Sequence, residues 1–129
     1  MSLSGIALVE AQRGNKKLAR GLGSEAARML DRSGDQAGLY GALNNLAVIE
    51  IMSGRYRQAI ETIERLLALR AVPDLYCSIG WQHLMLGQLR ERTGDSVGAQ
   101  AALQAASTVF GQIGERQGLA AVERGAVVR

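Results

Sequence analysis

The chain has 129 residues, of which 47% are apolar and 4% aromatic, with a formal net charge of +3. This composition suits one globular domain and excludes an intrinsically disordered chain. No apolar run reaches the roughly 18 residues of a membrane span, nor does a signal-peptide pattern open the chain, so with its single cysteine we expect a cytoplasmic protein.

Seven helices separated by short turns are the expected elements. Apolar residues recur at spacings of three and four, as in Leu39, Leu43 and Leu46, and no segment sustains two-residue alternation. Sixteen glycines against one proline fit helices that end at glycine turns. In chain order, the helices are predicted over 3–13, 16–32, 36–53, 56–71, 75–93, 96–113 and 116–128.

Four basic residues lie around the first turn. They are the densest positive cluster in the chain, but no basic run reaches five residues. A solvated helix face explains such a cluster better than nucleic-acid contact, which we do not expect. The residues are Arg13, Lys16, Lys17 and Arg20.

An internal repeat is the strongest pattern in the chain. Gly14, Gly54 and Gly94 are 40 residues apart, in "RGNKKLA", "SGRYRQA" and "TGDSVGA". A second register repeats "GDQAGL" at 34–39 as "GERQGL" at 114–119, two periods later, and a turn through Pro73 and Asp74 takes the middle place. Each period therefore contains two turns and two helices.

Small residues flank each glycine turn at fixed distances. Antiparallel helices joined by a short turn cross closely only where both carry Gly, Ala or Ser. The pairs predicted to lie at these crossings are Ala7 with Ala19, Ala47 with Ala59, and Gly87 with Ala99. The glycines at 14, 54 and 94 are expected to adopt the left-handed conformation that ends a helix.

The central copy, "LNNLAVIEIMSGRYRQAIETIERLLAL", resembles the tetratricopeptide repeat family. The matching positions are Leu46, Ala47, Gly54, Tyr56, Ala59 and Leu66. The other copies depart from the pattern, with Gly23 where a bulky residue is expected, Ser96 in place of the turn tyrosine, and Ala71 where a proline usually follows. The period is 40 residues rather than about 34, as in bacterial signal-responsive regulators of the LuxR and MalT kind and related ATPases.

The resemblance implies an all-α fold, a right-handed α-α superhelix of about three and a half stacked helical hairpins. One domain over 1–129 is expected, with repeats at about 1–35, 36–73 and 74–115 and a final half-repeat at 116–129 that caps the third. Helix 56–71 then packs on its partner 36–53 and on the next pair.

Residues suited to catalysis or metal binding are few. His83 is the only histidine and lies six residues from Cys77, on a different helix face, so a nucleophile–base pair between them is not expected. Cys77 is interpreted as a packing residue and His83 as a partly buried one. No phosphate-binding glycine motif occurs, and Glu50, aligned with Glu10, is interpreted as an inter-helix polar contact. We expect no enzyme activity, cofactor or metal.

The family binds its ligands in a concave groove lined by the first helix of each pair. Carried over, this geometry implies the groove residues Leu8, Asn44, Val48, Ile51, Trp81, Leu84, Gln88, Arg92 and Arg124. Trp81, the single tryptophan, either anchors a partner or packs inside the stack, and the sequence leaves both open. The family's Lys–Asn carboxylate clamp is absent, since Asn44 is followed one turn later by Val48 and Leu84 by Gln88.

The sequence thus predicts a non-enzymatic scaffold for protein or peptide, as a fragment or companion of a bacterial regulator of transcription. The expected ligand is an amphipathic helix or an extended peptide in the apolar groove. Exposed repeat ends would allow self-association or contact with another domain. The alternative is a sensor domain that binds a small ligand or peptide and changes superhelical curvature.

Overall fold

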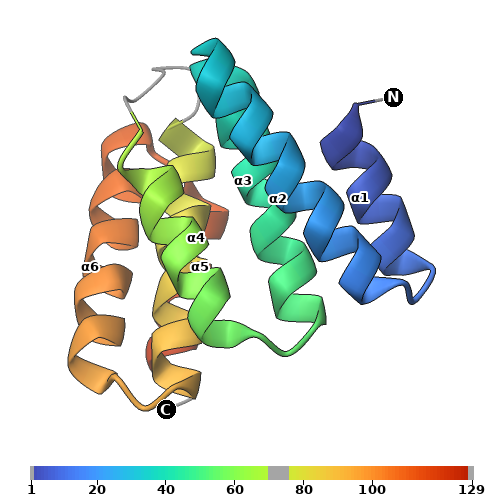
Figure 1. The fold of residues 1–129 in the computed structure, drawn as a ribbon. Helices are drawn as coiled ribbons and strands as arrows, with labels where there is room; N and C mark the ends of the chain where they lie inside the picture. The colour runs from blue at the N-terminus through green and yellow to red at the C-terminus, as the bar shows by residue number, and fades with distance from the viewer. Residues whose placement is uncertain (1, 70–75, 128–129) are drawn as a thin grey trace. The chain divides into compact units, whose positions relative to one another are not determined.

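The computed structural model describes residues 2–69 and 76–127, and side chains over 2–69 and 78–124. Within these ranges the chain forms seven α-helices and no strand, which confirms the all-α prediction (Figure 1). The helices are α1 (Leu3–Gln12), α2 (Lys16–Ser33), α3 (Gln36–Met52), α4 (Tyr56–Leu67), α5 (Tyr76–Arg92), α6 (Ser96–Ile113) and α7 (Arg116–Val127).

Two compact units make up the chain and are described separately. The N-terminal unit is Met1–Arg70 and the C-terminal unit is Ala71–Arg129. The predicted turn at Pro73 and Asp74 lies outside the described residues, as does the side chain of Cys77. In the part of the chain that the structure describes, no helix combines the length and apolar character needed to cross a lipid bilayer.

The helix boundaries agree with the predicted ones to within one residue, except at the end of α4. This helix was expected to reach residue 71, but it ends at Leu67. The amide of Leu69 bonds to the carbonyl of Leu66 over 3.2 Å, a three-residue step that tightens the last turn. The prediction was wrong here because apolar spacing continues past the point where the backbone leaves the helix.

Five glycines form identical helix ends. Gly14, Gly34, Gly54, Gly94 and Gly114 all have positive φ, between 69° and 92°. In the turn at Gly54, the glycine amide bonds to Ile51 O over 3.0 Å, and the Arg55 amide bonds to Glu50 O over 2.9 Å. These two bonds define the Schellman motif. The predicted left-handed conformation of Gly14, Gly54 and Gly94 is thus confirmed. The turns of the second repeat register, at Gly34 and Gly114, have the same geometry, so the five glycines are spaced by 20 residues or a multiple of 20.

The segments "GDQAG" at 34–38 and "GDSVG" at 94–98 share a pattern that has a local cause in helix capping. The Asp35 carboxylate accepts the Gly38 amide over 2.8 Å, and Asp95 accepts the Gly98 amide over the same distance. A Cβ atom on either glycine would overlap the capping carboxylate. Glycine at this position therefore lets the aspartate fold over the helix start.

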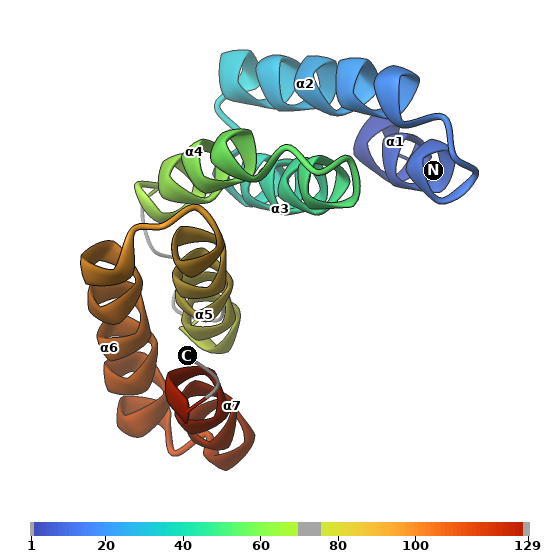
Figure 2. The same cartoon turned by 90° about the horizontal axis from the view of Figure 1, so that it is seen from below.

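Packing in the N-terminal unit follows the predicted crossings. Helices α1 and α2, α2 and α3, and α3 and α4 pack in succession, and α1 also contacts α3 (Figure 2). The alanines assigned to the crossings are fully buried at 0% exposure: Ala7, Ala19, Ala47 and Ala59. The packing of α4 on α3 is confirmed.

In the C-terminal unit, α5 and α6 form a hairpin, and α7 packs on both (Figure 2). A Cβ atom on Gly87 would lie 3.3 Å from the carbonyl oxygen of Ala99, so the two backbones cross as closely as predicted. The ring of Phe110 from α6 is fully buried and lies against Gly80 of α5 and Gly118 of α7.

Each unit repeats one arrangement, in which the first and third helices touch: α1 with α3, and α5 with α7. Stacked hairpins produce such contacts. A continuous right-handed superhelix with one groove would involve both units together and stays a prediction, as do the single domain over 1–129 and the packing of α4 on the following pair.

Replacing Gly54 by alanine is expected to lower the free energy of unfolding by about 1–2 kcal/mol, because a Cβ atom strains a residue at φ +72°. The control is Gly41→Ala in α3, where nothing lies within 4 Å of the added atom. That substitution should stabilise the chain by about 0.5–1 kcal/mol. Urea titrations of both variants measure the difference, and a Gly54 variant as stable as the control would contradict the turn geometry.

Candidate functional site

The predicted groove residues of α3 share one face. Asn44, Val48 and Ile51 follow at spacings of four and three, away from the buried stripe of the helix, and all three are half-buried. Leu8 of α1 is also half-buried and packs on the core cluster of Ala7, Ala11, Ala19 and Ile49. These residues lie in the N-terminal unit.

The remaining groove candidates lie in the C-terminal unit. Trp81, Gln88 and Arg92 are exposed on one face of α5, and Arg124 is exposed on α7. Leu84 departs from the prediction, since it is 5% exposed and packs with Leu103, Ala106 and Phe110. Its side chain belongs to the core because α6 and α7 supply apolar partners on that side of α5.

Trp81 combines the two roles that the sequence left open. Its ring meets the Phe110 ring edge-on, with centroids 5.2 Å apart and an interplanar angle of 65°. The residue nevertheless stays 37% exposed. The contact with Phe110 orients the indole. Trp81 is therefore an exposed aromatic side chain held in place by the core.

Glu50 makes the inter-helix contact predicted for it. The residue is 8% exposed on α3, and its Oε1 atom lies 2.6 Å from the hydroxyl oxygen of Thr62 on α4. Burial raises the pKa of Glu50 and is the largest influence. The Thr62 hydrogen bond and the positive charge of Arg20 lower this pKa, and the negative charge of Glu61 raises it further.

An open pocket of about 340 Å³ lies beside Glu50, between α2, α3 and α4. Its lining residues are Arg20, Gly21, Ser24, Leu46, Glu50, Arg55 and Gln58. Neither the Arg20 nor the Arg55 side chain forms a hydrogen bond or a close ion pair with another residue of the described ranges. The pocket thus brings two arginines together with a buried carboxyl group, and the charge of Arg20 acts on that group.

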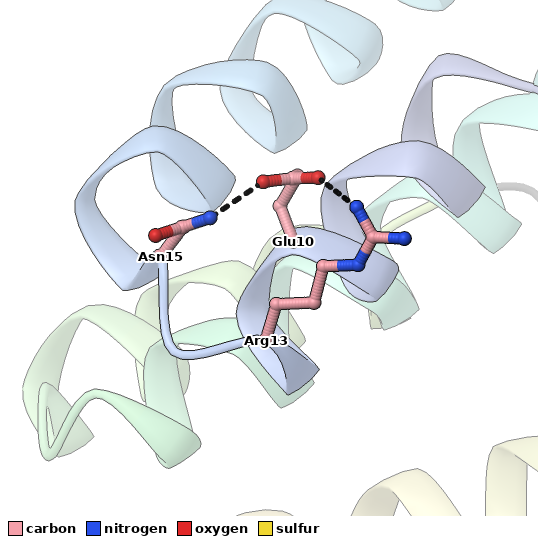
Figure 3. A network of polar contacts seen from close by, with 3 residues as sticks. All are labelled: Glu10, Arg13 and Asn15. Atoms are coloured by element: carbon pink, nitrogen blue, oxygen red, sulfur yellow. Dashed lines mark hydrogen bonds and ion pairs between the residues drawn. The ribbon is translucent and has the colours of Figure 1, made fainter.

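In the first hairpin, Glu10 takes the position of Glu50, and residues of the turn that follows α1 bind its carboxylate. Glu10 of α1 accepts a hydrogen bond from Asn15 Nδ2 over 2.8 Å and forms a 3.5 Å ion pair with Arg13 (Figure 3). Arg55 stands where that hairpin has Asn15, 40 residues later. In the C-terminal unit, Arg90 takes the position that Glu10 and Glu50 hold in the first two hairpins. Its Nη1 donates to the carbonyl of Gly98 over 3.2 Å. A buried carboxyl group at this position is a feature of the second hairpin.

His83 is half-buried, as the sequence predicted, and its pKa is lowered by burial and by the charge of Arg90. Among the described residues, no three His, Cys, Asp or Glu side chains gather closely enough to hold a metal ion.

Sequence reasoning identified Glu50 but missed the pocket around it. The lining residues come from three helices and the turn before α4, and they span 39 sequence positions, from Arg20 to Gln58. The available signal was an acidic residue in a helix with no other charged residue, followed five residues later by an arginine.

No protein-family model matches the chain, and no curated protein sequence matches it significantly.

Replacing Glu50 by glutamine is expected to stabilise the fold above the pKa of Glu50. Because the folded-state pKa is raised, wild-type stability is fully present below the unfolded pKa and is lost as pH rises through the folded one. The gain of the variant should therefore appear as pH rises and vanish below about pH 4. Denaturant titrations from pH 4 to 8 measure it.

The control for this titration is Glu25→Gln, which removes a charge from an exposed ion pair with Arg28. It should change the unfolding free energy by less than about 0.5 kcal/mol. A Glu50→Gln variant that is less stable than wild type at pH 8 would contradict the prediction.

Proposed function

We propose that this chain is a non-enzymatic helical-repeat module that binds a protein or peptide. The observation that carries the proposal is the exposed face of α5, where Trp81 is 37% exposed and its ring rests on Phe110. Gln88 and Arg92 lie on the same face, two and three turns further along. Tryptophan and arginine are the residues most enriched at energetic centres of interfaces.

The resemblance to tetratricopeptide repeats supports this role, because that family presents the first helix of each pair to its partners. The partner of the proposed surface is an amphipathic helix or extended peptide with an apolar side chain for Trp81 and a carboxylate for Arg92. A place in a bacterial signal-responsive regulator, as a fragment or companion, belongs to the same proposal. So does self-association through exposed repeat ends.

A quantitative pull-down tests the Trp81 surface. The tagged chain captures its partner, and the partner's affinity is then measured for each variant. We expect Trp81→Ala to weaken binding about 30-fold or more, while the matched control Val97→Ala, which truncates an 84% exposed side chain on α6, changes it less than twofold. Val48→Asp tests the α3 face in the same assay. Unchanged capture by both Trp81→Ala and Val48→Asp would contradict the proposal.

The second candidate function is a sensor domain that binds a small ligand. The pocket beside Glu50 favours it, because a buried carboxyl group lies there together with two arginines whose side chains form no hydrogen bond or close ion pair in the part of the chain that the structure describes. Thermal-shift screening separates the roles. A small molecule that raises the melting temperature of wild type favours the sensor.

A further inference from the structure

The lining of the Glu50 pocket consists mainly of hydrogen-bond donors. Arg20 and Ser24 reach it from α2, Arg55 from the turn, and Gln58 from α4, over an apolar floor at Leu46. Guanidinium groups bind carboxylate and phosphate oxygens in a forked geometry. Since neither guanidinium group forms a hydrogen bond or close ion pair within the described ranges, the pocket carries positive charge that an anionic group would neutralise.

Hydrogen bonding around Thr62 shows where a proton can reside. The Thr62 hydroxyl oxygen lies 2.6 Å from Glu50 Oε1 and 3.0 Å from the backbone carbonyl of Gln58. A hydroxyl group has a single hydrogen and cannot donate to both. When Glu50 is ionised, Thr62 donates to it. When Glu50 is protonated, the carboxyl group donates to Thr62 and Thr62 donates to Gln58, so both short contacts become hydrogen bonds.

We propose that this pocket binds a compact oxyanion, a carboxylate or phosphate group, and that binding is coupled to protonation of Glu50. The inference rests on the sensor role and names its ligand class; it is independent of the Trp81 surface. The anion would lie between the guanidinium groups of Arg20 and Arg55. A charged Glu50 repels it, whereas a neutral Glu50 does not.

The charges around Glu50 agree with this coupling. Arg20 faces it from α2, Arg55 from the turn, and Glu61 from α4. The only charged side chain of α1 is Glu10, which is engaged by Arg13 and Asn15. A bound oxyanion adds a negative charge that disfavours the ionised form of Glu50, so above the pKa of Glu50 up to one proton is taken up for each anion bound.

A sulfate titration of the full chain tests the proposal, because sulfate keeps its charge between pH 5 and 8. The backbone amide NMR shifts of Arg55 and Gln58 and the side-chain amide shifts of Gln58 report binding, with sodium chloride at matched ionic strength as the reference. We expect saturable binding whose affinity falls up to tenfold for each pH unit above the pKa of Glu50. Inorganic phosphate and acetate in parallel titrations then assign the preferred anionic group.

Three variants make the test specific. Arg20→Gln and Arg55→Gln should each weaken sulfate binding about tenfold or more. Arg57→Gln removes the same charge two residues away on an exposed position outside the pocket and should change binding less than twofold. Glu50→Gln should bind sulfate with an affinity that no longer depends on pH.

Equal weakening by Arg57→Gln and Arg55→Gln, or a wild-type affinity independent of pH, would overturn the inference. A thermal-shift ligand whose binding survives Arg20→Gln would overturn this site while leaving the sensor role intact. Conversely, sulfate binding with the expected pH dependence supports the site even if the Trp81 surface captures no partner.

Discussion

Substituting alanine for Phe110 is expected to lower the free energy of unfolding of the C-terminal unit by about 3–5 kcal/mol. The ring is fully buried, and it joins three helices because it lies against Gly80 of α5 and Gly118 of α7. Its loss leaves a cavity between two glycines that have no side chain to fill it. Denaturant titrations followed by the fluorescence of Trp81, which touches the ring, measure the change.

A second substitution shows whether the glycines are required by the ring. A Cβ atom on Gly118 would lie 2.5 Å from Phe110 Cγ, so Gly118→Ala should cost about 1–3 kcal/mol. Gly111→Ala, next to Phe110 in α6 with open space around it, should instead stabilise the unit by about 0.5–1 kcal/mol.

The penalty at Gly118 should disappear in the Phe110→Ala background, because the added methyl group then enters the cavity. A Gly118→Ala effect that is the same in both backgrounds would show that the three-helix packing is wrong.

Much of the fold was predictable because its determinants are local. Helical spacing and glycine turns act over fewer than ten residues. The residues of a crossing pair, such as Ala47 and Ala59, lie on consecutive helices joined by a single short loop. A closer comparison of the two registers would also have revealed the 20-residue spacing of Gly14, Gly34 and Gly54, since one turn serves both.

Contacts between separate hairpins were not predictable in the same way. The resemblance predicts a bulky residue where the chain has Gly23, and Leu46 of α3 fills that space, with a side-chain atom 3.1 Å from where a Cβ would lie. Likewise, the resemblance predicts Leu84 on the groove surface, whereas apolar partners from α6 and α7 bury it in the core. A sequence shows which positions are small or apolar, and only the fold shows which distant side chain fills the space.

The candidate site likewise combines a contact within one hairpin, which was predictable, with a contact between hairpins, which was not. The contact of Glu50 with the neighbouring helix was predictable from its alignment with Glu10, because Thr62 lies on the helix that directly follows the turn at Gly54. Arg20 comes from the preceding hairpin, and its approach to Glu50 depends on how α2 packs on α3. No spacing in the sequence encodes that approach.

The crossing of α3 and α4 links this packing to the site. Ala59 is 0% exposed, and replacing it by leucine is expected to cost about 1–3 kcal/mol, because three added carbon atoms must separate the helices. Ala37→Leu, on an exposed position of α3, is the control and should stay within about 0.5 kcal/mol of wild type. Urea titrations at neutral pH compare the two, and equal losses would contradict the crossing.

Because Thr62 lies three residues after Ala59 on α4, separating the helices also lengthens its 2.6 Å contact with Glu50. We therefore expect Ala59→Leu, where it still folds, to weaken the pH dependence of sulfate binding, which Ala37→Leu should leave unchanged. A folded Ala59→Leu variant with the wild-type pH dependence would show that protonation of Glu50 does not depend on the α3–α4 crossing. Glu50 would then take up its proton without the support of Thr62.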